Sequence, residues 1–329
     1  MLGEFELIRH YFAAAACARA GGEVVLGIGD DCALLEIAAG EQLAVSTDTL
    51  VAGVHFPEPC DPHLLGQRAL AVAASDLAGM GATPIGFTLA LTLPAADPLW
   101  LAEFARGLDA MALDCSLRLI GGDTTRGPLC LTVTVFGRVP AGRALVRHGA
   151  RAGDLLCVGG VLGEAAGALP LVLHQAEAEA DVAAHLLARY WSPQPQLALG
   201  EALRGKATAA LDISDGLLAD CGHIARASGV ALRIERERVP LSGPLRRLAG
   251  DAEALHCALA GGDDYVLAFT LPPAELPALQ QGGWPLHVIG RAVAGQGVQL
   301  LDAEGEEVAV AVRGYNHFEA ESGRSRPTS

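Results

Sequence analysis

Apolar positions recur along this chain at two distinct spacings. Between residues 87 and 93 the sequence Phe-Thr-Leu-Ala-Leu-Thr-Leu partly alternates large apolar and smaller side chains, as a strand with one buried face does. Between residues 62 and 80, Ala69, Val72 and Met80 instead recur at helical spacing and share one face of a predicted helix. The two patterns succeed each other along most of the chain and predict a mixed α and β (α/β) fold.

The first half of the chain predicts one domain, residues 1–145. A passage rich in Pro and Gly, 139–153, separates its last strand from the next apolar run. Helices are expected at about 4–20, 62–80 and 98–114, and strands ending at Asp30 and spanning 43–48, 85–93, 117–121 and 130–139.

The second half predicts another domain of the same mixture, residues 146–318. Helices are expected at 163–178, 181–190, 215–228, 251–260 and 273–281, strands at 155–158, 208–213, 230–235, 265–270 and 287–293, and a hairpin near 298–312. The polar tail, 319–329, is expected to be disordered. A length of 329 residues exceeds the usual size of one domain, which agrees with this division.

The charge of the chain narrows the classes of function. A formal net charge of -15 argues against a general nucleic-acid binder, because phosphate backbones are held by clusters of Lys and Arg. Lys206 is the only lysine, and it is followed by Ala207 without the upstream glycine spacing, which excludes a phosphate-loop NTPase. An anionic substrate would therefore need metal bridges or local arginines.

The remaining composition predicts a cytoplasmic protein that does not enter the membrane. The 8 cysteines form no C-x-x-C pair and are typical of reduced, buried thiols. Glu4, Glu6 and Arg9 interrupt the stretch in which a signal peptide would be apolar. The uncharged stretch Leu77–Ala96 contains several Gly and Pro residues, which favour a helix end, a turn and a buried strand over a membrane span.

Aspartates recur at one kind of place, directly after an apolar run and among Gly, Ser or Thr. Because such a pattern is typical of a buried strand that ends in a tight turn, these carboxylates are expected at strand ends. Nine of them lie on six segments: Gly29-Asp30-Asp31, Ser46-Thr47-Asp48, Ser75-Asp76, Gly122-Asp123-Thr124, Asp212-Ile213-Ser214-Asp215 and Gly262-Asp263-Asp264.

Convergence of these segments would require cations. Two carboxylates about 4 Å apart repel by about 4 kcal/mol at an effective dielectric of about 20. Mg²⁺ and Ca²⁺ prefer oxygen ligands, so the pattern favours a site for divalent metal. The alternative is that each Asp separately caps a helix or forms a turn, which is the commoner use of a single Asp-Gly or Ser-Asp pair.

Asp76 is the most informative single carboxylate. It shares its predicted helix face with Ala69, Val72, Ala73 and Met80, and that face is expected to be buried. An ionised carboxylate there is costly unless it is paired or bound to metal, which favours a ligand role. A capping contact to a nearby backbone N–H is the alternative.

Other segments are candidates for binding phosphate. Gly121–Thr125 follows an apolar strand, and its glycines would let a ligand approach the backbone. Ser214 and Asp215 precede a predicted helix, whose N-terminus favours anions, although a simple N-cap is commoner. Arg147 could provide a bidentate phosphate contact. His55 is a lone histidine, and lone histidines are more often structural than ligands.

Taken in order, these segments closely resemble the thiamine-monophosphate kinase family, within the superfamily that includes aminoimidazole ribonucleotide synthetase, selenophosphate synthetase and a hydrogenase maturation factor. The likeness covers almost the whole chain. Its motifs are Gly3-Glu4-Phe5-Glu6-Leu7-Ile8, Gly27-Ile28-Gly29-Asp30-Asp31-Cys32-Ala33, Asp48-Thr49-Leu50-Val51-Ala52-Gly53-Val54-His55-Phe56, Ser75-Asp76-Leu77-Ala78-Gly79-Met80-Gly81-Ala82, Gly121-Gly122-Asp123-Thr124-Thr125, Asp212-Ile213-Ser214-Asp215-Gly216-Leu217, Gly261-Gly262-Asp263-Asp264-Tyr265 and Gly314-Tyr315-Asn316-His317-Phe318.

The resemblance implies a two-domain aminoimidazole ribonucleotide synthetase-like fold whose N-terminal domains pair in a homodimer, with active sites that use both subunits. It implies transfer of the γ-phosphoryl group of ATP to thiamine monophosphate, assisted by several Mg²⁺ ions. The implied metal ligands are Asp30, Ser46, Thr47, Asp48, Asp76, Asp123, Asp212 and Asp215. The implied nucleotide contacts are Gly122, Asp123, Arg147 and Ser214, and the implied substrate contacts are His55, Asp263 and Tyr315.

Direct in-line transfer is the chemistry that this resemblance implies. The acceptor is a phosphate monoester with a second pKa of about 6, so it is already an anion at pH 7 and needs no catalytic base. Two positions depart from the family pattern. Asp263 stands where the family usually has Glu, which shortens its reach to the substrate, and Ala73 lies near a position where the family often has Asn.

Two other functions are compatible with parts of the pattern. A selenophosphate synthetase-like enzyme would normally carry a reactive Cys or selenocysteine in a Gly-rich N-terminal segment, which this chain lacks. A nucleotide- and metal-binding module without turnover would have no need of so many acidic residues.

Overall fold

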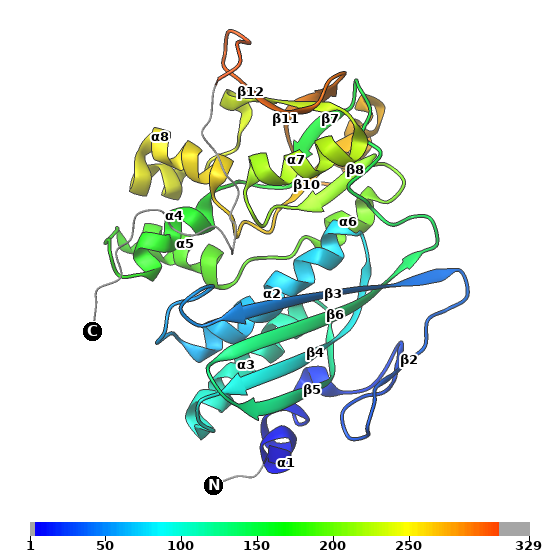
Figure 1. Ribbon diagram of the computed structural model, residues 1–329, viewed down its shortest axis with the longest axis vertical. Helices are drawn as coiled ribbons and strands as arrows, with labels where there is room; N and C mark the ends of the chain where they lie inside the picture. The colour runs from blue at the N-terminus through cyan, green and yellow to red at the C-terminus, as the bar shows by residue number, and fades with distance from the viewer. Residues whose placement is uncertain (1–3, 309–329) are drawn as a thin grey trace.

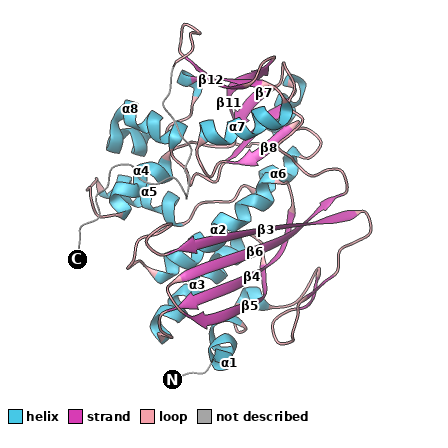
Figure 2. Cartoon of the chain, in the orientation of Figure 1, coloured by secondary structure: helices cyan, strands magenta, loops and turns pink. Residues whose placement is uncertain are grey.

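The computed structural model describes residues 4–308, which form two large sheets with helices packed on them and one small two-stranded sheet (Figure 1). Figure 2 shows the N-terminal sheet and the C-terminal sheet as separate sets of strands, each with its own helices. The predicted mixed α and β class is confirmed. Among residues 4–308, no helix is both long enough and apolar enough to cross a membrane.

The N-terminal sheet has the strand order β3-β6-β4-β5. Its strands are β3 (Glu41–Val51), β4 (Thr83–Leu93), β5 (Arg118–Arg126) and β6 (Cys130–Pro140). β6 runs antiparallel to β3 and β4, and β5 runs parallel to β4. A smaller sheet pairs β1 (Val24–Leu26) with β2 (Leu34–Leu35).

Two long helices, α2 (Pro62–Gly79) and α3 (Pro98–Asp114), cover one face of this sheet (Figure 1). Both begin in the same way: the carboxylates of Asp61 and Asp97 accept backbone N–H groups of the first turn, and a proline occupies the first helical position. Leu, Ala and Phe side chains from these helices form the main core with the apolar residues of the strands. The sequence-predicted bounds of 98–114 therefore agree with the structure.

The C-terminal sheet has the order β12-β9-β11-β7-β10-β8. All neighbouring pairs are antiparallel except β12 and β9. The strands are β7 (Leu155–Val158), β8 (Ala209–Asp212), β9 (Ala231–Glu235), β10 (Leu267–Leu271), β11 (His287–Val293) and β12 (Gly297–Leu301). The helices are α4 (Glu164–Val172), α5 (Ala180–Trp191), α6 (Leu197–Leu203), α7 (Leu217–Ser228), α8 (Gly243–Ala260) and α9 (Leu276–Gln281).

Several predicted elements have different bounds in the structure. The helix expected at 4–20 is instead α1 (Glu4–Leu7), a π-helical turn (Ile8–Phe12) and a 3₁₀ turn (Ala16–Ala18). The strand expected to end at Asp30 already ends at Leu26. Helix α4 ends at Val172 rather than 178, shortly after Pro170, which cannot donate a helical hydrogen bond.

Two helical segments were not predicted. Helix α6 has only 7 residues and follows the Pro-broken link, which obscured it. The first part of α8, before a kink at Gly250 with φ of 76°, precedes the expected start at 251. Two further 3₁₀ turns are Arg236–Arg238 and Pro273–Glu275.

Helix α2 packs between the N-terminal sheet and elements of the C-terminal half of the chain. A Cβ added to Gly200 of α6 would lie 2.3 Å from the Ala78 carbonyl oxygen, so the two backbones are in contact there. Arg204 donates to Thr83 Oγ1 at 2.8 Å, and the Leu145 N–H donates to the Met80 carbonyl at 3.0 Å. The end of α2 and the start of β4 are therefore in contact with α6, with the turn after it and with the segment before β7. The domain boundary predicted near 145 falls between β6 and β7 and stays a prediction.

Candidate functional site

Three aspartates from distant parts of the chain meet where the two sheets approach each other. Asp48 comes from β3, Asp76 from α2 and Asp212 from the end of β8. Ser46 Oγ donates to Asp76 Oδ2, and Ser75 Oγ donates to Asp212 Oδ2 at 2.7 Å. We call these five residues the interface cluster.

The interface cluster is electrostatically costly. Burial, followed by the charges of Asp76 and Asp212, raises the pKa of Asp48 to about 7. Burial and the charge of Asp76 raise the pKa of Asp212 to about 6, although Ser75 and the more distant Arg147 act to lower it. The carboxylates destabilise one another's charged forms, so positive charge brought to this point would be bound favourably.

The turn between β8 and α7 lies beside the interface cluster. Its Ser214 and Asp215 backbone N–H groups both donate to Asp220 Oδ2 at 3.0 Å. Asp220 is buried in the first turn of α7, and burial raises its pKa to about 7. Gly216 provides the φ of 112° that the turn needs.

Asp220 was not predicted as a site residue from the sequence, because its contacts are with the backbone N–H groups of other residues. An acidic residue in the first turn of a predicted helix was the available signal. The alternative proposed for Ser214 and Asp215, a simple N-cap, is not what the structure shows, since α7 begins with Gly216 as N-cap and no side-chain capping bond.

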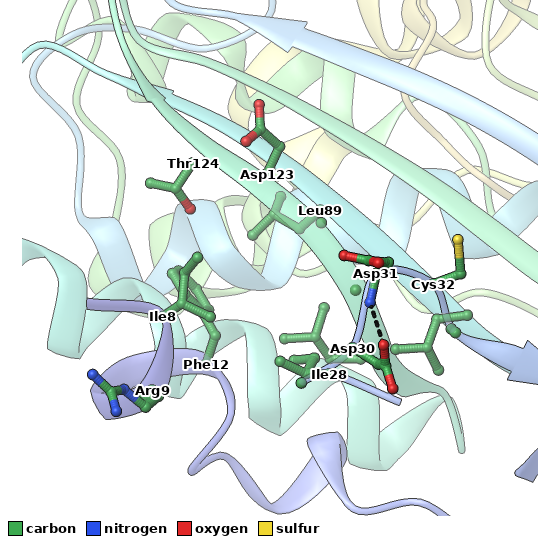
Figure 3. Close-up of a pocket in the computed structure, with 16 residues that line it drawn as sticks. Ile8, Arg9, Phe12, Ile28, Asp30, Asp31, Cys32, Leu89, Asp123 and Thr124 are labelled. Carbon is green, nitrogen blue, oxygen red and sulfur yellow. Dashed lines mark hydrogen bonds between the residues drawn. The ribbon is translucent and has the colours of Figure 1, made fainter. Parts of the chain in front are cut away.

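A second group of predicted site residues lines a cavity of about 810 Å³ beside β5, which we call the β5 cavity (Figure 3). Asp30 and Asp31 come from the loop between β1 and β2, and Asp123 and Thr124 come from β5. Figure 3 shows Ile8, Arg9 and Phe12 of the N-terminal helical turn on the opposite wall.

Gly122 is required at the β5 cavity by packing. A Cβ at this position would lie 2.0 Å from the Leu89 carbonyl oxygen, and its φ of 154° is one that other residues rarely adopt. The strand can therefore run close against β4 and leave its exposed edge open to a ligand.

The two groups lie at opposite edges of the N-terminal sheet. Asp48 pairs with Val133, Val133 with Leu89, and Leu89 with Gly122, so one row of residues crosses all four strands. Three inter-strand steps separate the ends of this row by about 14 Å. Asp123 follows Gly122 and therefore faces the side opposite to Asp48, because neighbouring strand residues point to opposite faces.

Thr47 is likewise separated from its neighbours Ser46 and Asp48. Its Oγ1 contacts Thr134 Oγ1 at 2.9 Å on the solvent-exposed side of the sheet. Thr49 and Thr132 form an equivalent pair at 2.9 Å on the same side. The side chain of Thr47 is thus not part of the interface cluster.

The prediction that the aspartates sit at strand ends is wrong for Asp48 and Asp123, which lie within β3 and β5. Asp76 lies within α2, which confirms the helix predicted at 62–80. Asp212 is the last residue of β8 and fits the prediction. The small residues after each apolar run do not break β3, because β6 pairs with it without interruption from Glu41 to Val51.

The predicted substrate contacts His55 and Asp263 are linked to each other through Tyr190 and Arg68. His55 Nδ1 accepts the Val51 N–H at 3.0 Å, and the His55 carbonyl accepts Tyr190 Oη at 3.1 Å. Asp263 forms an ion pair with Arg68 at 2.8 Å and accepts Tyr265 Oη at 2.8 Å. Tyr315 lies outside the described residues. Arg68, which is almost fully buried on α2, was not predicted from the sequence.

The donor chemistry of the interface cluster fits a hard divalent cation. Its side chains offer only carboxylate and hydroxyl oxygens, which Mg²⁺ and Ca²⁺ prefer, and the raised pKa values of Asp48 and Asp212 agree with a site that a cation would stabilise. Within residues 4–308, no three His, Cys, Asp or Glu side chains converge tightly enough to form a ready metal site. Serine hydroxyls and backbone carbonyls would have to complete the coordination.

Two protein families match successive parts of this chain. Residues 29–139 match AIR synthase related protein, N-terminal domain, and residues 151–303 match AIR synthase related protein, C-terminal domain. The thiamine-monophosphate kinase of Salmonella typhimurium is 45% identical over 322 residues, which cover 96% of this chain and 98% of that protein.

Solved structures agree with the sequence relatives. The crystal structure of thiamine-monophosphate kinase from Stenotrophomonas maltophilia is 46% identical, with a TM-score of 0.81 over 87% of this chain and 92% of that one. The structure of AaThiL complexed with AMPPCP and TMP is 31% identical, with a TM-score of 0.78 over 88% of this chain and 92% of that one. The chain therefore belongs to the AIR synthase-related family and, within it, to the thiamine-monophosphate kinases.

Proposed function

We propose that this protein transfers the γ-phosphoryl group of ATP to thiamine monophosphate, giving thiamine diphosphate and ADP. The observation that carries this proposal is the near-full-length similarity to thiamine-monophosphate kinases. It is supported by a 31% identical structure whose bound molecules are named as AMPPCP and TMP.

The reaction is a direct displacement. The terminal oxygen of the thiamine monophosphate phosphate attacks the γ-phosphorus, the bond from that phosphorus to the bridging oxygen of ADP breaks, and ADP leaves with the electron pair. Because the acceptor oxygen is already anionic at pH 7, no side chain has to remove a proton. The chain then has to hold two anionic phosphates in line and stabilise the charge that develops.

Different residues are assigned to these tasks. Arg147, whose charge acts to lower the pKa of Asp212, is assigned to a phosphate together with Ser214 of the adjoining turn. Gly122 and Asp123 line the β5 cavity and are assigned to the nucleotide. His55, Asp263 and, beyond the described residues, Tyr315 are assigned to thiamine monophosphate.

Divalent cations, Mg²⁺ in this proposal, would neutralise the phosphates. The residues assigned to hold them are Asp30, Ser46, Thr47, Asp48, Asp76, Asp123, Asp212 and Asp215. Thr47 would have to contribute its backbone carbonyl, since its side chain faces away from Asp48. The other assignments use side-chain oxygens.

We also propose that two copies of the chain form a homodimer with composite sites. The assigned ligands of one chain lie at both edges of the N-terminal sheet, about 14 Å apart. A second copy seated on the uncovered face, to which Asp123 points, would place the β5 edge of one subunit beside the β3 edge of the other. Leu43 and Val45 expose apolar side chains on this face, 44% and 54% respectively, as a buried contact would require.

A cytoplasmic location remains part of the proposal. The 8 cysteines all fall within residues 4–308 and are free thiols. Free thiols agree with a reducing compartment.

The function is tested by incubating purified protein with ATP, Mg²⁺ and thiamine monophosphate and separating the products. Thiamine diphosphate and ADP are expected in equal amounts. A matched reaction with free thiamine in place of thiamine monophosphate should give no diphosphate. Absence of product above the reaction without protein contradicts the proposed activity.

A further inference from the structure

Arg68 of α2 is buried at the contact between the two domains. Its residue exposure is 1%, and its guanidinium lies 4.1 Å from the centre of the Tyr190 ring. One terminal nitrogen donates to the Tyr190 carbonyl at 2.6 Å, and the other lies 2.8 Å from Asp263 Oδ2. A buried guanidinium is costly unless its partners are fixed, so this arrangement is unlike that of a surface arginine.

Asp263 is held from two sides. Arg68 contacts one carboxylate oxygen, and Tyr265 Oη donates to the other at 2.8 Å. The side chain is nevertheless 37% exposed, so one side of the carboxylate stays open. Its orientation is thus set by the protein before any ligand arrives.

The loop that carries Asp263 has a strained backbone. Asp263 and Tyr265 have φ of 67° and 50°, values that side-chain-bearing residues rarely adopt. The Asp263 N–H donates to the Ser214 carbonyl at 2.9 Å, and the Tyr265 N–H donates to the Ile213 carbonyl at 2.8 Å. The loop is therefore locked against the turn assigned to the nucleotide.

Gly262 makes this close approach possible. A Cβ at this position would lie 2.2 Å from the Ser214 carbonyl oxygen. The acceptor side and the nucleotide side of the site thus touch through backbone alone at this point.

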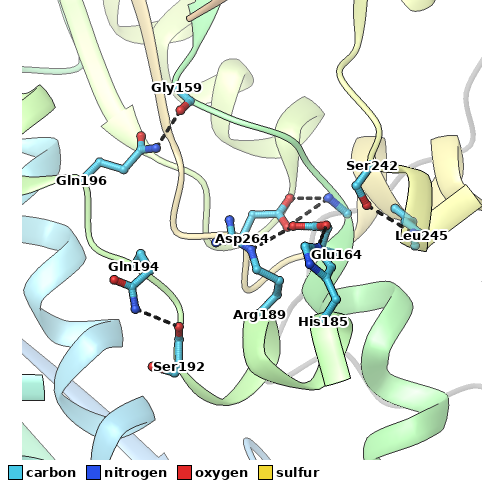
Figure 4. A network of polar contacts seen from close by, with 11 residues as sticks. Gly159, Glu164, His185, Arg189, Ser192, Gln194, Gln196, Ser242, Leu245 and Asp264 are labelled. Carbon is cyan, nitrogen blue, oxygen red and sulfur yellow. Dashed lines mark hydrogen bonds and ion pairs between the residues drawn. The ribbon is translucent and has the colours of Figure 1, made fainter. Parts of the chain in front are cut away.

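A second set of contacts fixes the other end of the loop (Figure 4). Both oxygens of the buried Asp264 accept the Gly163 N–H, at 3.0 and 2.8 Å. The next residue, Glu164, pairs with Arg189 at 2.8 Å and with His185 at 2.6 Å on α5.

These contacts form a closed circuit of residues that includes Asp263. Arg68 pairs with Asp263, and the next residue, Asp264, accepts the Gly163 N–H. Glu164, which follows Gly163, pairs with Arg189, and Tyr190, which follows Arg189, contacts Arg68. Arg68 is the member of the circuit that comes from the N-terminal domain. The same helix, α2, carries Ser75 and Asp76 of the interface cluster.

We propose that Arg68 is a positioning residue for the phosphoryl acceptor: it fixes the Asp263 carboxylate relative to α2 and thereby relative to the interface cluster on the same helix. This inference rests on the proposed function, in which Asp263 contacts thiamine monophosphate. Since Asp263 is shorter than the Glu usual in the family, the exposed side of its carboxylate reaches the substrate only where Arg68 and Tyr265 hold it.

The experiment uses Arg68→Met, Arg68→Lys and Tyr265→Phe in the full chain, with KM measured separately for thiamine monophosphate and for ATP. Arg68→Met should raise KM for thiamine monophosphate about tenfold, the scale of a lost charged hydrogen bond, and leave KM for ATP within about twofold. Arg68→Lys should recover part of the loss, since an ammonium can reach one partner but not both. Tyr265→Phe should give a smaller rise in the same constant.

A double-mutant cycle separates positioning from a merely structural role. In an Asp263→Asn background, Arg68→Met should add little to KM for thiamine monophosphate, because the group that it positions is gone. Arg204→Met is the matched control: it removes another arginine contact between the domains and should lower the melting temperature while leaving this KM unchanged.

Each remaining outcome counts against the inference. Equal rises in both KM values, or the same effect of Arg68→Met with and without Asp263, would show that Arg68 only supports the fold. If Arg68→Met does not fold, the Arg68→Lys and Tyr265→Phe variants decide, and unchanged KM values in both overturn the proposal. Wild-type protein that makes no thiamine diphosphate instead removes the proposed function itself.

Discussion

Asp212 of the interface cluster is 8% exposed, whereas Asp30, Asp31 and Asp123 of the β5 cavity are open to solvent. Both groups are acidic and both belong to the segments that resemble the family. Water can stabilise the charges of the open group, but the buried group depends on protons or cations for its neutralisation. The comparison teaches that similar sequence motifs can have different electrostatic tasks.

The largest expected effect is the loss of turnover on altering the buried group. Asp212→Asn should lower kcat by at least about a hundredfold, the scale of one lost electrostatic stabiliser, because the amide cannot hold a divalent cation as the carboxylate does. Asp48→Asn should behave similarly. The measurement is kcat at saturating Mg²⁺, with circular dichroism to check the fold. Asp31→Asn, a change in the open group, is the control, and near-normal rates for Asp212→Asn would remove it from the metal site.

Mixing experiments test whether the two groups meet only between subunits. Asp48→Asn and Asp123→Asn chains, each almost inactive alone, should regain about a quarter of wild-type activity when co-expressed at equal amounts, because half of the dimers are mixed and one of their two sites is intact. If both groups served one site within a single chain, every site would carry a substitution and no activity would return. Activity of tagged, purified mixed dimers is the measurement.

Asp264 allows the effect of burial to be measured apart from that of metal binding. It is buried like Asp212 but belongs neither to the interface cluster nor to the β5 cavity. Burial raises its pKa from 3.8 to about 8, although the Gly163 N–H opposes this. It is therefore protonated in the folded protein, and its contribution to stability is complete below pH 3.8 and is lost as the pH rises through about 8. The slope is at most about 1.4 kcal/mol per pH unit.

Urea unfolding at a series of pH values measures this contribution. Asp264→Asn should show a flatter dependence than the wild type between pH 5 and 8, with and without Mg²⁺. A difference between the two proteins that disappears on adding Mg²⁺ would instead place Asp264 with the metal-dependent group.

The smallest expected effect is that of replacing His55, which is assigned to thiamine monophosphate. His55→Ala should raise KM for thiamine monophosphate several-fold, about the effect of one lost hydrogen bond, and change KM for ATP less. Steady-state kinetics with each substrate varied in turn measure both constants. The opposite order would assign His55 to the nucleotide side of the site.

The sequence predicted the bounds of those helices and strands whose ends are determined by neighbouring residues in the chain. The bounds of α3 follow from Asp97 and Pro98, and those of β7 and β11 from short apolar runs between turn residues. The full length of β3 could not be predicted, because it depends on pairing with β6, which is distant in sequence.

The candidate site shows the same limit. The sequence identified the segments that contain Asp48, Asp76 and Asp212, which the structure brings together. It could not show that β3 and β5 lie at opposite edges, because strand order is a property of the whole sheet. Arg68 and Asp220 were missed because each acts on a partner and neither carries a motif of its own.

The contact of Gly262 with the Ser214 carbonyl limits how this enzyme can acquire new acceptors. A larger residue at 262 would push the loop that carries Asp263 away from the turn at Ser214, so a change that widens this loop also disturbs the residues assigned to the nucleotide. Directed evolution toward other phosphorylated acceptors should therefore keep residues 261–265 fixed. Sequence diversity is better placed in the 57–61 segment that follows His55, which lines a separate cavity together with residues of α4 and α5.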